Sequence, residues 1–245
     1  MELTVIGGCG GYPDRGRPCS GYVVRLDGFS ILIDPGYGVG TALTIDERVA
    51  FDAVLVTHGH PDHCVDLNAI LRTRLWAAPP AAPLPVYALP GALEAVMALD
   101  RQEALAGSFV LRDIEPGVEF SIGPFQVRSA LLPHPRPNIG IRLSNAGRSL
   151  VYSGDCGPSE GLIRLADGTD VLLAEASYAA TVPLEIVGAL SSAADVGHEA
   201  ASARVQRLIL THLMPSTDET EAVTAAGHFY AGQIDVARPG LVVKL

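Results

Sequence analysis

Charged residues are scarce in this chain, and long hydrophobic runs are missing from it. Asp, Glu, Lys and Arg make up 18% of the 245 residues, and the acidic ones outnumber the basic ones, which gives a net charge of −10. An acidic surface repels a phosphate backbone, so we expect no large nucleic-acid partner. No apolar run approaches the roughly 20 residues that cross a bilayer, so we expect no membrane span. The 48% of hydrophobic residues instead favours a compact globular protein.

Cysteines are few and show no recognisable pairing. The four of them, Cys9, Cys19, Cys64 and Cys156, form no C-x-x-C motif, so reduced thiols in a cytosol are the default expectation. The opening residues 1–6 predict a first strand and lack the hydrophobic core of a secretory signal. We therefore predict a cytoplasmic protein.

What the sequence does contain is a dense group of metal-ligand side chains between Thr57 and His63. Three histidines and an aspartate fall within six residues, directly behind the apolar run 53–56, which predicts a buried strand. Gly59 and Pro61 interrupt that strand and place the polar residues on a tight loop, and apolar spacing then predicts a helix over 62–76. Histidine nitrogen and carboxylate oxygen are ligands suited to zinc and its divalent neighbours. The pattern predicts a catalytic metal site in preference to a polar surface turn.

Three more ligand-type residues stand near the ends of other predicted strands. His134, Asp155 and His212 each follow an apolar, strand-like run by no more than three residues. Five of the seven histidines of the chain belong to the combined set, which chance rarely assembles. The sequence therefore predicts that several strand ends meet at one metal site.

The remaining pattern is that of one α/β domain over residues 1–245, with hairpins at the start and strand–helix alternation in the middle. Asp27-Gly28 is a two-residue hairpin signal, and Ser192 to Asp195 predicts a capping box. The proline-rich stretch 76–85 is either a wall or lid beside the site or a plain connector. Helices are predicted at 62–76, 91–105, 161–166, 192–203 and 218–229, and strands at 3–6, 22–26, 29–33, 53–56, 86–89, 109–111, 125–132, 139–143, 149–152, 171–174, 207–210 and 241–244.

The stretch His58-x-His60-x-Asp62-His63 resembles the signature of the metallo-β-lactamase superfamily. The resemblance runs nearly end to end, and Gly7-Gly8-Cys9-Gly10-Gly11, Ser153-Gly154-Asp155 and Leu210-Thr211-His212 are similar to the ribonuclease Z and small phosphodiesterase branch. It implies an αβ/βα sandwich of two mixed β-sheets flanked by helices, in a single α/β domain, built around two metals.

The resemblance also implies how the ligands divide. His58, His60 and His134 would hold one metal, Asp62, His63 and His212 the other, and Asp155 would bridge them. Two zinc ions fit this nitrogen and oxygen set best, with manganese or iron as alternatives. Asp34, at the end of another predicted strand, would support the histidine loop from behind the ligands. Its other interpretation is a residue chosen for turn chemistry.

The implied activity is hydrolysis by a metal-bound hydroxide without a covalent enzyme intermediate. Asp62 would both bind metal and orient the attacking hydroxide. The two-metal arrangement suits displacement at phosphorus, so we expect a small phosphodiester, such as a cyclic nucleotide, as substrate. Only 20 residues separate His134 from Asp155, too few for the substrate arm that ribonuclease Z enzymes insert there. The alternative is an ester, lactone or thioester hydrolase. A β-lactamase and a non-catalytic metal-binding or redox module are the remaining alternatives.

The chain departs from the branch at the residue that protonates the leaving group. The expected histidine is replaced by Leu190, and His198 is a candidate general acid only if its helix runs along the metal cleft. Alternatively, His198 is simply an exposed residue on the surface of its helix. Tyr178, Arg136 and Arg17 are candidate contacts for a small-molecule substrate, and a homodimer is one option for the assembly.

Overall fold

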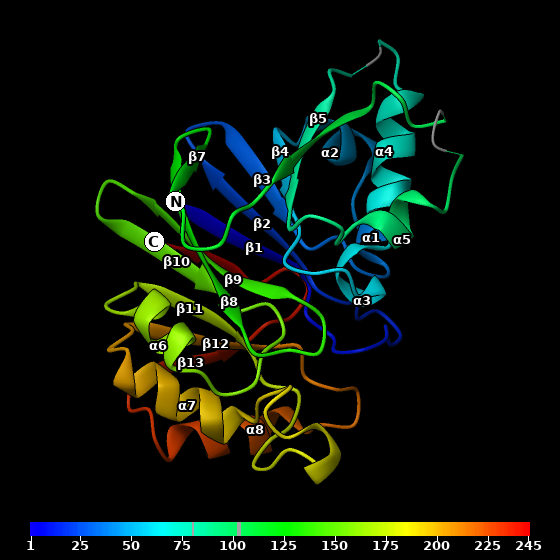
Figure 1. Cartoon of the computed structure of the whole chain (residues 1–245). Helices are drawn as coiled ribbons and strands as arrows, with labels where there is room; N and C mark the ends of the chain where they lie inside the picture. The colour runs from blue at the N-terminus through cyan, green and yellow to red at the C-terminus, as the bar shows by residue number, and fades with distance from the viewer. Residues whose placement is uncertain (80, 102–103) are drawn as a thin grey trace.

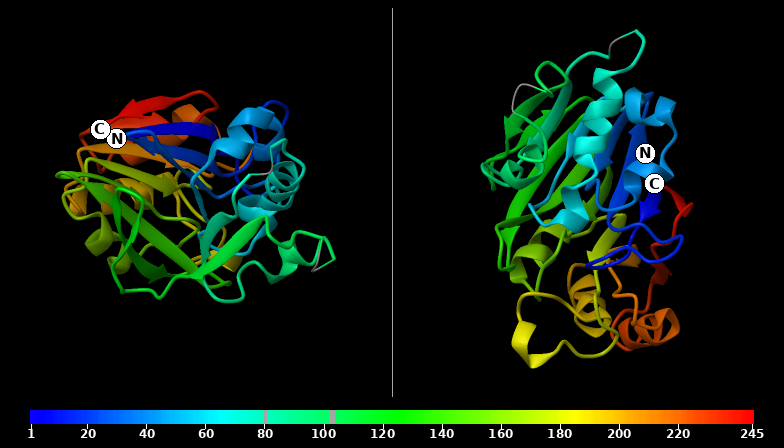
Figure 2. Two further views of the ribbon diagram at one scale, coloured as in Figure 1. Left: turned by 90° about the horizontal axis from the view of Figure 1, so that it is seen from above. Right: turned by 90° about the vertical axis from the view of Figure 1, so that its right-hand side faces the viewer.

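Two seven-stranded β-sheets face each other, and helices cover their outer faces (Figure 1). The computed structural model describes residues 1–79, 81–101 and 104–245. This is the single-domain αβ/βα sandwich that the sequence predicts. The two views of Figure 2 show the sheets as adjacent layers, with both chain termini on one side of the molecule.

The first sheet is built mainly from the first half of the chain. Its order is β14–β1–β2–β3–β4–β5–β6, with β14 Val242–Lys244, β1 Glu2–Gly7, β2 Gly21–Leu26, β3 Phe29–Ile33, β4 Ala53–Leu55, β5 Leu84–Ala88 and β6 Phe109–Asp113. β1 to β3 are antiparallel and β3 to β6 parallel. The hairpin at Asp27-Gly28 is confirmed, because both residues have the positive φ angles (50° and 84°) that a tight hairpin of this kind requires.

The second sheet takes the remaining strands, in the order β13–β12–β11–β10–β9–β8–β7. These are β13 Gln233–Val236, β12 Arg207–Thr211, β11 Val171–Glu175, β10 Arg148–Tyr152, β9 Asn138–Asn145, β8 Phe125–Leu132 and β7 Phe120–Ile122. β10 to β13 run parallel. Their carboxyl ends therefore lie at one edge of the sheet, where ligand residues can gather.

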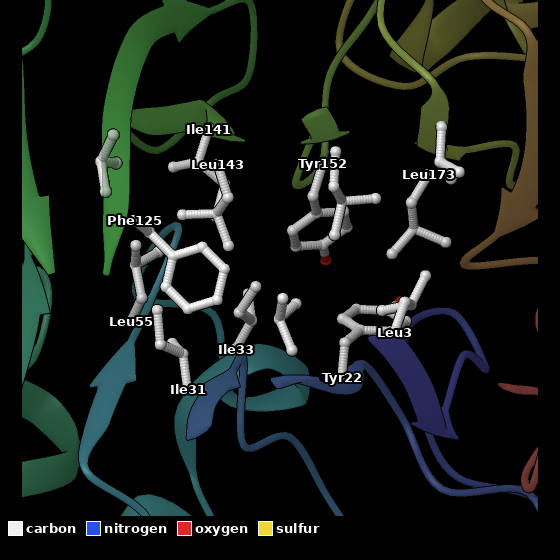
Figure 3. Close-up of a cluster of buried hydrophobic side chains, with 14 of the residues drawn as sticks. Leu3, Tyr22, Ile31, Ile33, Leu55, Phe125, Ile141, Leu143, Tyr152 and Leu173 are labelled. Carbon is white, nitrogen blue, oxygen red and sulfur yellow. The ribbon is translucent and has the colours of Figure 1, made fainter. Parts of the chain in front are cut away.

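Apolar packing holds the layers together in three clusters. The central cluster lies between the sheets and includes Leu3, Phe125 and the two buried tyrosines Tyr22 and Tyr152 (Figure 3). The other two lie between each sheet and its own helices. Those helices are α1 Val39–Ala42, α2 Ile45–Ala50, α3 Pro61–Cys64, α4 Leu67–Leu75, α5 Glu94–Met97, α6 Glu160–Ala166, α7 Ala193–Ser202 and α8 Glu219–Gly227, with a 3₁₀ turn at Leu184–Ile186. Among the described residues, no helix has both the length and the apolar character to cross a bilayer.

The helix predicted over 62–76 is divided into α3 and α4. The Asp66 N–H donates to the carbonyl of Pro35 instead of extending α3, and the Asp62 carbonyl packs against Gly36 so tightly that a Cβ there would lie 1.9 Å from its oxygen. Contacts with the loop after β3 thus interrupt the helical hydrogen-bond ladder. Apolar spacing alone could not indicate this break.

The helix predicted over 91–105 is also wrong in its extent. Among the described residues of that range, only α5 forms as regular helix, and Gly91 adopts a left-handed φ of 79° before it. Residues 102 and 103 of that prediction lie outside the described residues, as does residue 80 of the proline-rich stretch. By contrast, α7 begins as predicted at Ser192, whose side chain forms a reciprocal capping box with Asp195.

Candidate metal centre

Four loops at strand ends bring the seven predicted ligands into one cluster, buried except for the half-buried His60 and His134. The histidine loop follows β4, His134 follows β8, Asp155 follows β10 and His212 follows β12. The cluster thus spans both sheets, since β4 belongs to the first sheet and the other three strands to the second. Its candidate ligand atoms form two groups, and within each group they all lie within 4.8 Å of one another.

The first group contains three imidazoles whose ring nitrogens converge. His58 Nε2 lies 3.0 Å from His60 Nδ1, which lies 3.1 Å from His134 Nε2. The Asp155 Oδ2 oxygen completes the group, 3.8 Å from His58 Nε2. The tautomer of each ring decides which nitrogen carries a proton, and a ring nitrogen without one offers a lone pair. Three nitrogens aimed at a common point are the donor set of a metal site.

The second group uses the other oxygen of the same aspartate. Asp155 Oδ1 lies 3.0 Å from His63 Nε2 and 3.4 Å from His212 Nε2. Asp62 Oδ2 lies 3.2 Å from His212 Nε2. The two carboxylate oxygens of Asp155 therefore face different groups.

Two atoms in the second group are buried and have no hydrogen-bond partner within the described residues. They are His63 Nε2 and Asp155 Oδ1. Buried polar atoms are almost always satisfied, because an unpaired one costs about 1–3 kcal/mol. Both atoms point into the cluster, so the residues present fit a divalent metal ion.

The electrostatics of the groups differ. Burial chiefly lowers the pKa of His58, with the charges of neighbouring histidines adding to the effect. Burial opposes the charged form of His63 too, but the adjacent Asp155 and Asp34 carboxylates outweigh it and raise its pKa. Burial likewise favours neutral Asp62, yet its hydrogen bond to His212 and the charge of His63 bring the pKa of Asp62 down to about 2.

Asp34 stands directly behind His63, as the sequence predicts. This fully buried carboxylate has one oxygen, Oδ2, within hydrogen-bond distance of three groups: His63 Nδ1 at 2.8 Å, the Thr57 hydroxyl at 2.7 Å and the Tyr152 hydroxyl at 3.0 Å. Its Oδ1 accepts from the Thr57 backbone N–H. A carboxylate behind a ligand histidine selects the ring tautomer and orients the ring.

Tyr152→Phe is expected to weaken metal binding by the second group about tenfold, because it removes one of the donors that hold Asp34 in place. Competition with a chromogenic chelator measures the affinity. Tyr230→Phe is the matched control, since that buried hydroxyl donates to the Val205 carbonyl, far along the sheet from the cluster. Equal metal affinities in the two variants would contradict the expected result.

A second buried carboxylate, Glu175, was not predicted to take part. It ends β11 and accepts hydrogen bonds from the backbone N–H groups of Cys156, Ser177 and Ser191. Burial, together with the negative charge of Asp155, raises the pKa of Glu175 to about 7. Glu175 thereby ties together three loops that surround the cluster. Its position at the end of a buried strand, between two ligand-bearing strands, was the available signal.

The glycine-rich loop after β1 contacts the second group from outside. The Gly11 N–H donates to Asp62 Oδ2 at 3.1 Å. A Cβ at Gly10 would lie 2.4 Å from the carbonyl oxygen of His212, so only glycine fits there. His212 itself adopts a left-handed φ of 57°, a strained conformation for a side-chain-bearing residue that is typical of functional sites.

The other predicted site residues, which are the candidate substrate contacts, belong to neither ligand group. Arg136 is exposed near His60, whose pKa is lowered chiefly by burial and further by the charges of His134 and Arg136. Tyr178 is half-buried, and its backbone pairs with Ser192 at the start of α7. Arg17 lines a separate hollow with Asp14 and Thr41 and belongs to neither ligand group.

His198 lies on the exposed face of α7, where its ring meets the edge of Phe229 with 6.1 Å between the centroids. It is in neither ligand group. Leu190 is closer to the cluster, because the carbonyl of the preceding Ala189 lies 3.0 Å from His134 Nδ1. The position that supplies a histidine in the resembling branch is therefore near the ligands, but it carries an aliphatic side chain.

Comparisons with known proteins identify the family of this chain. The family described as Beta-lactamase superfamily domain matches residues 30–213. The chain is 30% identical to an uncharacterised protein of Mycobacterium leprae over 98% of this chain and 87% of the other. It is 29% identical to a ribonuclease Z of Mycolicibacterium paratuberculosis over 96% of this chain and 95% of that one. The crystal structure of the metallo-β-lactamase fold protein YhfI of Bacillus subtilis superimposes with a TM-score of 0.90 at 24% identity, covering 99% of this chain and 98% of that one.

This protein is thus a metallo-hydrolase with a cluster of histidine and aspartate residues at its strand ends. The chain is a member of the β-lactamase superfamily.

Proposed function

We propose that this protein is a dinuclear metal-dependent hydrolase that cleaves a small phosphodiester. The observation that carries the proposal is the position of Asp155, whose two oxygens face two separate groups of ligand atoms. His58, His60 and His134 would hold one ion, Asp62, His63 and His212 the other, and Asp155 would bridge them. Zinc suits this donor set, with manganese or iron as alternatives. When bound, two such metal ions would supply an activated water and stabilise the charge of the transition state.

Side chains of this protein would orient the water, bind the substrate and determine which leaving groups can depart. Asp62 would orient the attacking water, since the Gly11 N–H fixes its Oδ2 oxygen. Arg136 is exposed beside His60 and would pair with an anionic oxygen of the substrate. Leu190 cannot donate a proton, so the substrate would need a leaving group that departs without one. Tyr178 and Arg17 remain predicted substrate contacts.

A phosphodiester substrate is supported by the likeness to ribonuclease Z and by the exposed guanidinium of Arg136. A small diester, resembling a cyclic nucleotide, fits the acidic chain better than a large RNA. The replacement of the expected histidine by Leu190 favours a second candidate, an ester, lactone or thioester hydrolase. A β-lactamase is the weaker alternative because no cysteine belongs to either described ligand group, and a non-catalytic metal or redox module is the last. Cytoplasmic location and a homodimeric assembly stay predictions.

The test is a substrate panel on purified protein of known metal content. Chromogenic aryl phosphodiesters and a cyclic nucleotide are compared with a lactone, a thioester, an aryl ester and a β-lactam. We expect kcat/KM to be highest for a phosphodiester with an acidic leaving group. Comparable or faster turnover of the β-lactam, or of the carboxyl esters alone, would refute the proposal.

His198→Ala is expected to lower turnover of substrates with acidic leaving groups less than tenfold. General acid catalysis is typically worth about 100- to 10,000-fold, and the ring packs against Phe229 outside both ligand groups. Steady-state kinetics at constant metal content measure the effect. A loss beyond 100-fold would show that His198 protonates the leaving group.

A further inference from the structure

A hollow opens between the two loops that carry the first ligand group. It has a volume of about 220 Å³. Gly59 on its wall lies between His58 and His60 in the sequence, and Arg136 and Pro137 follow His134 by two and three residues. Leu89, Pro90, Gly91 and Ala92, from the loop after β5, form the rest of the wall. We call this cavity the Arg136 hollow.

Apart from Arg136, the side chains that line the Arg136 hollow carry no polar atom. Leu89 and Ala92 are aliphatic, and the two prolines have no backbone N–H to donate. The Ala92 N–H is already used by the Leu89 carbonyl. A polar group buried there without a partner would cost free energy, so these walls suit an apolar or aromatic group.

Arg136 is the one charged side chain among the residues lining the hollow. It is exposed, and its charge reaches His60, whose pKa is lowered mainly by burial and in part by this guanidinium. In a chain with a net charge of −10, a cation beside the metal ligands attracts anions against the general field of the protein.

The volume limits how much of a substrate can enter. Pockets for whole drug-sized ligands are about 300–1,000 Å³, and the Arg136 hollow is smaller. It holds one ring-sized group while the rest of the ligand stays outside. The reacting phosphorus would lie beside the first group of metal-ligand residues, next to the hollow.

We propose that the Arg136 hollow is a subsite that binds one flat, apolar arm of the substrate, while Arg136 pairs with the anionic phosphoryl oxygen at its mouth. This inference rests on the proposed function and narrows the substrate to phosphodiesters with at least one aromatic arm. Diesters with two small aliphatic arms leave the hollow empty and bind more weakly.

Phosphonates test the subsite without requiring turnover. Phenylphosphonate and methylphosphonate present the same anion and differ only in the arm, so the ratio of their Kd values reports the hollow. Isothermal titration of the metal-loaded protein should give at least about tenfold tighter binding of phenylphosphonate. Ala92→Phe, which fills the hollow, should bring the ratio of the two Kd values close to one. Ala180→Phe is the matched control, because Ala180 lines a different hollow beside α8.

Arg136→Ala should weaken both phosphonates by a similar factor, about tenfold, and leave their ratio unchanged. A wild-type ratio near one, or a ratio that survives Ala92→Phe, would overturn the subsite. If the ratio behaves as expected but no phosphodiester is cleaved, the proposed reaction is wrong and the subsite stands.

Discussion

Asp155→Ala is expected to remove most of the bound metal and to lower turnover by more than about 100-fold. Losing a hydrogen-bond partner behind a metal ligand already lowers metal affinity or activity about 10- to 100-fold. Asp155 is itself the candidate ligand whose oxygens face both groups. Its loss would also leave the buried His63 Nε2 without its nearest carboxylate oxygen, which lies 3.0 Å away. Elemental analysis and kinetics on one preparation measure both effects.

The control for that experiment must separate metal loss from unfolding. Asp170→Ala serves this purpose, because Asp170 is also a buried carboxylate of the second sheet but pairs with Arg148 away from the cluster. We expect Asp170→Ala to lower the melting temperature and to keep its metal. If Asp155→Ala retains the wild-type metal content, Asp155 does not join the two groups.

Acidification should release the two proposed metal ions in a defined order, with the ion of the second group leaving first. Bound metal competes with protons for the ligand nitrogens. In the metal-free protein the carboxylates of Asp155 and Asp34 overcome burial and raise the pKa of His63, while burial lowers the pKa of His58. Protons therefore displace the ion at His63 as pH falls through that raised pKa, while His58 remains neutral. Metal content after dialysis over a pH series measures the order.

Metal is lost as pH falls, but the folding stability of the metal-free protein should decrease as pH rises. A histidine whose folded pKa is raised contributes stability that is complete below its unfolded pKa and is lost as pH rises through the folded pKa. Metal-free protein should thus lose stability as pH rises from 6.5 through the raised pKa of His63, whereas metal-loaded protein should not. Release of both ions at one pH, or of the first group's ion before the second, would contradict this electrostatic difference.

The ligand residues could be predicted because each is signalled locally. A histidine or aspartate that follows an apolar strand, on a loop interrupted by glycine or proline, is visible in a few residues of sequence. The structure brings all seven together in two groups. The capping box at Ser192 and the hairpin at Asp27-Gly28 were predictable for the same reason.

The supporting contacts could not be predicted because they join distant segments. Tyr152 donates to Asp34, 118 residues away in the sequence, and Glu175 accepts from amides on three separate loops. The break between α3 and α4 has the same origin, since the Asp66 amide finds its partner at Pro35. Neither periodicity nor residue type records such a pairing.

The sequence by itself predicted an α/β domain and the candidate ligand residues, because periodicity, turn chemistry and donor type are properties of short segments. The resemblance to the superfamily added the sandwich and the absence of the expected histidine at Leu190. The tertiary structure supplied the distances behind the division of the ligands that the resemblance implied, with the two oxygens of Asp155 facing different groups. It also decided that His198 faces Phe229 and that Arg136 borders a hollow beside the ligands. The physical reason is that these relations depend on how two sheets pack across a shared core, and that packing sets distances between residues far apart in the chain.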